Sequence, residues 1–111
     1  MIQTMTLLPG VTLRCYSVAR FKQACLNIHF VSPASAETAS VNALIPAVLL
    51  RGTVKHPDMR SISLHMDDLY GAGVGMAMRR VGDYQLVGFK SGFIDERYAL
   101  PGDKVLEPML D

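Results

Sequence analysis

Two hydrophobic patterns divide the chain, a strict alternation of apolar and polar residues in some segments and a helical spacing in others. Residues 11–18 alternate, and residues 22–32 carry apolar side chains mainly at even positions, which is typical of strands with one buried face. Ala19-Arg20 between them predicts a hairpin. Residues 1–10 are interpreted as a lead-in that ends at a Pro9-Gly10 turn.

The most apolar segment, residues 43–50, predicts a buried helix. Thr38 or Ser40 can cap its N-terminus, and the wide apolar face extends to Leu50. Gly52 is suited to the left-handed position that ends many helices. Pro46 lacks the N–H that a helix interior needs, so we expect a kink or a late start.

A second helix is predicted after His56-Pro57, with Asp58 as its N-terminal cap and Gly71 at its end. Met59, Ile62, Met66 and Leu69 recur at spacings of three and four, which is the stripe of an amphipathic helix. We expect these methionines, and Met76 and Met78 at strand spacing, to fill the core.

The C-terminal third predicts two strands and the start of a third helix. Residues 74–80 and 84–94 flank a Gly82-Asp83 hairpin turn. Asp103 is expected to cap a helix over residues 104–111, with Val105, Leu106, Met109 and Leu110 exposed for want of a packing partner. We therefore expect residues 1–111 to be the incomplete N-terminal part of one larger domain, prone to self-association.

Strand pairs linked by hairpins, with the helices in runs, predict an α+β fold in which helices pack on one face of an antiparallel sheet. The net charge of +1 gives no reason to expect nucleic acid as a partner. The longest apolar run is too short to span a membrane, and no signal peptide is evident. These features predict a cytoplasmic protein.

Few residues suggest chemistry. His29, His56 and His65 lie on different predicted elements without metal-ligand spacing, and each is interpreted as a surface or partly exposed side chain. If residues 11–18 and 22–32 pair, Cys15 and Cys25 fall on opposite faces of the sheet, so we expect two free thiols.

Arg51-Gly52-Thr53 and the order of the elements resemble the N-terminal part of an M16 (insulinase or pitrilysin type) zinc peptidase domain. In active members H-x-x-E-H on a helix shortly precedes such a tripeptide; the two His bind zinc and the Glu activates water. The corresponding residues here are Ala43, Pro46 and Ala47. The resemblance places the third family ligand beyond residue 111. It therefore implies a truncated LuxS/MPP-like half domain with no catalytic, cofactor-binding or metal-binding residue.

Residues 44–53, His56-Pro57 and Asp68-Leu-Tyr-Gly-Ala72 resemble the inactive, bacterial M16-like branch that is named for its association with elongation factor P 5-aminopentanone modification. That resemblance implies a non-catalytic partner of an active M16 homologue, or of the second half of the same chain, that contributes to binding an extended peptide. Two alternatives stay open. The chain could be a fragment of a working zinc metallopeptidase whose active site lies elsewhere, or an unrelated binding or structural module.

Overall fold

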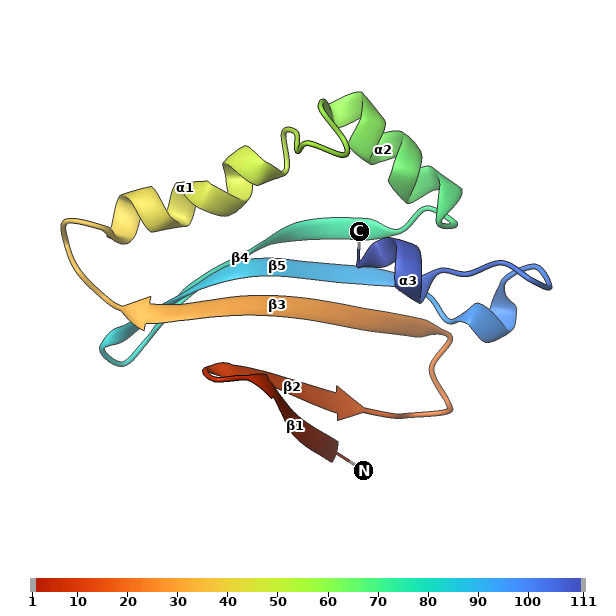
Figure 1. The fold of residues 1–111 in the computed structure, drawn as a ribbon, viewed down its shortest axis with the longest axis horizontal. Coiled ribbons are helices and arrows are strands. Elements are labelled where there is room, and N and C mark those ends of the chain that lie inside the picture. The colour runs from red at the N-terminus through yellow and green to blue at the C-terminus, as the bar shows by residue number, and fades with distance from the viewer. Residues whose placement is uncertain (1, 111) are drawn as a thin grey trace.

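Residues 2–110 fold into two antiparallel sheets and three α-helices. The computed structural model describes residues 2–110. The elements are β1 (Ile2–Leu8), β2 (Val11–Tyr16), β3 (Gln23–Pro33), α1 (Ala39–Leu49), α2 (Met59–Asp68), β4 (Gly73–Val81), β5 (Tyr84–Ile94), the 3-10 turn η1 (Glu96–Tyr98) and α3 (Leu106–Met109). β1 pairs with β2, and the second sheet has the order β3-β5-β4. Helices α1 and α2 lie over one side of this sheet, while the β1–β2 hairpin lies beyond β3 (Figure 1). The α+β prediction is confirmed.

The N-terminal hairpin differs from the prediction. The segment interpreted as a lead-in contains the strand β1. The partner of β2 is therefore β1, and not β3 as predicted. Gly10 adopts a φ of 79°, which glycine accepts without strain, so the Pro9-Gly10 turn closes a hairpin that alternation alone did not reveal. Ala19-Arg20 lies in the connection between the two sheets and is not a hairpin turn.

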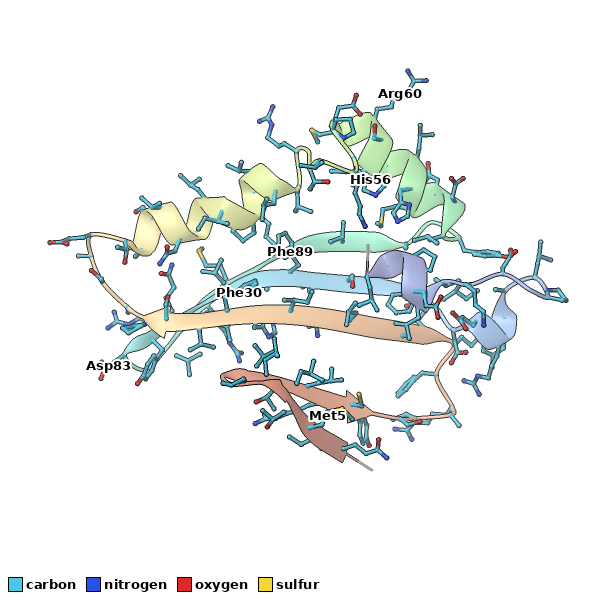
Figure 2. All side chains as sticks on the ribbon, in the orientation of Figure 1. Met5, Phe30, His56, Arg60, Asp83 and Phe89 are labelled. Atoms are coloured by element: carbon cyan, nitrogen blue, oxygen red, sulfur yellow. The ribbon has the colours of Figure 1, made fainter. Side chains whose placement is uncertain are left out.

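The three-stranded sheet follows the predicted alternation. The β4–β5 hairpin turns at Gly82, with a φ of 59°, as expected. β3 pairs along its whole length with β5, so that Ile28 lies opposite Phe89 and Phe30 opposite Val87. Phe30 and Phe89 lie on the side of the sheet that faces the helices (Figure 2), and Ile28 and Val87 line cavities together with residues of α1, because residues two apart on a strand share a face.

Helix α1 begins at Ala39 and continues through Pro46, so of the two effects expected of the proline, a kink or a late start, the late start does not occur. The prediction of a buried helix is wrong, because Pro46 is its one buried residue. Its N-cap residue is Thr38, whose side chain makes no capping hydrogen bond. Gly52 does not adopt a left-handed conformation. Glycine is required there for a different reason: a Cβ would lie 2.5 Å from the carbonyl oxygen of Pro57, where the connection to α2 folds back.

Helix α2 matches its prediction more closely. Asp58 is the N-cap, and its carboxylate accepts a hydrogen bond from the backbone N–H of Ser61 at 2.7 Å. The methionine prediction is wrong in large part, since Met59, Met76 and Met78 are exposed and only Met66 of that set is half-buried. No helix among residues 2–110 is long and apolar enough to cross a membrane.

The C-terminal segment packs in a way that the sequence did not predict. Of the four residues expected to be exposed, Val105 is fully buried against Leu69 and Phe93, and Met109 is half-buried against the same cluster. Leu106 and Leu110 are exposed, as expected. Asp103 does not cap α3. Instead, a Glu96 carboxylate oxygen accepts hydrogen bonds from the backbone N–H groups of Val105 at 3.0 Å and Leu106 at 3.1 Å. A side chain from η1 therefore caps this helix start from outside, and Val105 enters the core.

Candidate functional site

The three positions that the resemblance marks for chemistry all lie on α1. Pro46 is the buried residue of the helix, and Ala43 and Ala47 are half-buried. Their methyl groups and the pyrrolidine ring carry no atom that could bind a metal or transfer a proton. At these positions the helix offers only apolar surface.

Two apolar cavities separate the helices from the sheet. One, of about 280 Å³, lies mainly under α2 and the end of α1, with lining residues that include Leu26, Ile62 and Val74. The other, of about 360 Å³, lies under the middle of α1 against Phe30 and Val87. Leu49 and Phe89 line both cavities, so the two are neighbours along α1. Figure 2 shows Phe30 and Phe89 on this side of the sheet.

The three histidines are not equivalent in space. His29 lies on β3 and is exposed, as expected. His56 and His65 come from the α1–α2 connection and from α2, yet their ring centroids are 4.5 Å apart. Both line the 280 Å³ cavity. Sequence spacing could not reveal this pair, because a fold in the connection brings His56 back over α2.

Among the residues that the structure describes, no aspartate, glutamate, lysine or arginine lines either cavity or lies on α1. Hydrogen bonds from Ser61 hold the pKa of the Asp58 carboxyl below its ordinary value, and the bonds from the Val105 and Leu106 N–H groups do the same for the pKa of Glu96. The hydrogen bond to Asp103 raises the pKa of Tyr70. All three shifts come from groups that stabilise turns and helix starts.

Tyr70 belongs to the Leu-Tyr-Gly-Ala string and joins α2 to the segment after η1. Its backbone is left-handed, with a φ of 63°, which is uncommon outside glycine. Its hydroxyl donates a hydrogen bond to the carboxylate of Asp103 and accepts one from the N–H of Leu100 at 2.9 Å. The string thus has a structural role that links α2 to this segment.

The two cysteines, Cys15 and Cys25, are free and exposed. The argument from sheet parity was wrong, because they lie in different sheets and not on paired strands. Among residues 2–110, no group of three or more His, Cys, Asp and Glu side chains lies close enough together to hold a metal ion.

The structure is thus an antiparallel sheet covered on one face by helices, with two apolar cavities between the helices and the sheet. A comparison with known protein families finds no match. The chain is 29% identical over 98 residues to the protein described as "Probable inactive metalloprotease YmfF" of Bacillus subtilis (strain 168), a stretch covering 88% of this chain and 23% of that protein.

A solved structure has the same fold. The crystal structure of a conserved protein from Enterococcus faecalis V583 superposes with a TM-score of 0.93 and 20% sequence identity, over 99% of this chain and 26% of that one. The chain thus spans about a quarter of the length of either protein. The fold is shared, and the sequence match supports a distant relationship to an inactive metalloprotease-like protein.

Proposed function

We propose that this chain is the N-terminal part of a zinc-less, M16-like domain that acts as a non-catalytic partner in peptide binding. The observation that carries the proposal is the set Ala43, Pro46 and Ala47 on α1, in a chain distantly related to a protein described as an inactive metalloprotease. A helix without ligands at these positions can shape a binding chamber but cannot activate water.

The exposed apolar surface of α1 supports a partner. Val41, Leu44 and Val48 form a stripe on α1 and are 61–63% exposed, although the opposite side of the helix already faces the sheet. A helix that is apolar all round is normally buried. The covering surface would come from the rest of a longer chain or from an active M16 homologue in the cytoplasm; the longer relatives offer a precedent for the first source.

The cavities under α1 supply the apolar wall for an extended peptide, and the sheet supplies edges. β3 and β4 each pair with β5 alone in the three-stranded sheet. An extended peptide can pair with such an edge through its main chain. The finer assignment, to the branch associated with elongation factor P modification, belongs to this proposal and rests on the residue strings alone.

Metal content tests the non-catalytic part of the proposal. We expect elemental analysis of the purified protein to show far less than one zinc per chain, and no peptidase activity when zinc is added. About one tightly bound zinc per chain, lost with activity on chelation, would overturn the proposal in favour of a working metallopeptidase.

A peptide-retention assay tests the proposed role in peptide binding. Ile45 lines the larger cavity from α1 and is 49% exposed, so a peptide bound in that cavity would cover it. An aspartate carboxylate there would lose water on binding without gaining a partner, at a cost of more than about 1.4 kcal/mol, so Ile45→Asp should weaken retention of labelled unstructured peptides at least about tenfold. Val54→Asp is the matched control, because Val54 is fully exposed and lies outside both cavities. Equal peptide binding by the Ile45→Asp and Val54→Asp variants would show that the larger cavity does not bind the peptide.

A further inference from the structure

His56 and His65 are held side by side by independent contacts. The Thr53–His56 turn is closed by two reciprocal hydrogen bonds: the Thr53 N–H donates to the His56 carbonyl at 2.7 Å, and the His56 N–H donates to the Thr53 hydroxyl at 3.1 Å. His65 is fixed on α2. The two rings, tilted by 33°, therefore lie in contact without a ligand to bring them together. Figure 2 shows His56 in the connection beside α2.

One ring nitrogen of His65 is assigned by its partner. Its Nε2 lies 3.0 Å from the carbonyl oxygen of Pro108, which can only accept, so Nε2 carries the proton. In the neutral imidazole, the form that binds a metal, the other nitrogen, Nδ1, then holds the lone pair. Histidines that bind metals commonly have this arrangement, in which the second ring nitrogen donates to a carbonyl or carboxylate and fixes the tautomer.

Two thioethers line the same cavity as the imidazoles. Met66 follows His65 directly on α2, and Met109 follows the Pro108 carbonyl to which His65 is bonded. The lining includes no cysteine and no carboxylate. The available soft or borderline donors are therefore two imidazoles and two thioethers.

We propose that His56, His65, Met66 and Met109 form a binding site for a soft monovalent metal ion, with Cu(I) as the physiological candidate. Thioether and imidazole donors suit Cu(I). Charge decides between metals: a divalent ion in an apolar cavity without a carboxylate or thiolate would keep its full charge of +2 uncompensated, whereas a monovalent ion keeps half of that.

The ring separation agrees with a shared ion. A metal–nitrogen bond of about 2.0 Å places an imidazole centroid about 3 Å from the metal, so two rings on one ion lie no more than about 6 Å apart. The observed 4.5 Å falls within this limit. Small rotations of the rings and of the flexible methionines would complete the coordination.

The experiment requires a background without thiols, because the exposed Cys15 and Cys25 would themselves bind Cu(I). In Cys15→Ser/Cys25→Ser protein, Cu(I) is titrated under anaerobic conditions against a chromophoric chelator, and Ag(I) serves as a redox-inert probe. We expect one ion per chain. Histidine NMR signals should shift for His56 and His65 but not for His29, which is exposed on β3.

Variants assign the ligands. Loss of a supporting partner alone weakens metal sites by about 10–100-fold, so His56→Ala and His65→Ala should each cost at least about 100-fold in affinity. Met66→Leu and Met109→Leu should each weaken binding while preserving volume, and His29→Ala should leave it unchanged. Absence of binding, Zn(II) binding as tight as Cu(I), or metal shifts in His29 alone would overturn the proposal. A zinc-free protein that binds Cu(I) would leave the proposed peptide-binding role to its own tests.

Discussion

Gly88 and Gly92 on β5 form a matched pair with opposite expectations. A Cβ at Gly88 would lie 1.8 Å from the backbone oxygen of Ile28 on β3, whereas a Cβ at Gly92 would meet nothing within 4 Å. Both are even-numbered positions of the same strand and both pair with β3. Alanine therefore tests close backbone approach at one position and glycine's conformational freedom at the other.

The magnitude follows from the geometry. Since real Cβ atoms stay beyond 3.0 Å of such atoms, β3 and β5 must separate by at least 1.2 Å (3.0 − 1.8) around Gly88. Overpacking of this kind costs about 1–3 kcal/mol, and each ladder hydrogen bond lost nearby costs about 0.5–1.5 kcal/mol more. We expect Gly88→Ala to lower the free energy of unfolding by about 3 kcal/mol. Gly92→Ala should raise it by up to about 1 kcal/mol, since glycine weakens strands.

Urea unfolding followed by circular dichroism measures both changes, at one fixed protein concentration so that association does not enter the comparison. The slope of the transition should stay constant if only stability changes. A Gly88→Ala protein as stable as the parent, or equal losses for both variants, would refute the proposed contact between β5 and the Ile28 carbonyl.

Three further predictions concern the segment after β5. Val105→Ala should cost about 2–3 kcal/mol in urea unfolding, from two lost carbons and the cavity they leave, because Val105 is fully buried; Val54→Ala, at an exposed site, should change stability by less than about 0.5 kcal/mol. The pKa of Glu96 is lowered in the folded state by N–H donors, so its contribution is present above its unfolded pKa and is lost as the pH falls through the folded value. Glu96→Gln should therefore reduce the acid sensitivity of unfolding, and an unchanged pH profile would contradict this. Tyr70→Phe removes the bonds to Asp103 and the Leu100 N–H, so amide exchange at Leu100 should accelerate while exchange in β5 stays unchanged.

Much of the fold was predictable because many of its elements follow from local patterns. The β4–β5 hairpin, the Asp58 cap and the apolar face of β3 follow from turn residues, capping chemistry and alternation, all of which act over a few neighbouring residues. The prediction of the first hairpin was wrong because these patterns act only over neighbouring residues. Val11–Tyr16 has two possible partners, and alternation states that a strand has a buried face but not which strand lies beside it.

Some features of the candidate site were likewise predictable from local sequence, and others were not. The lack of ligands on α1 follows from residue identity alone, because Ala43, Pro46 and Ala47 carry no ligand or base whatever the fold. Three contacts became visible only in the folded chain: Val105 is buried, Glu96 caps α3, and His56 packs on His65. No short-range sequence pattern indicates these contacts, because chain reversal and packing bring the contacting residues together.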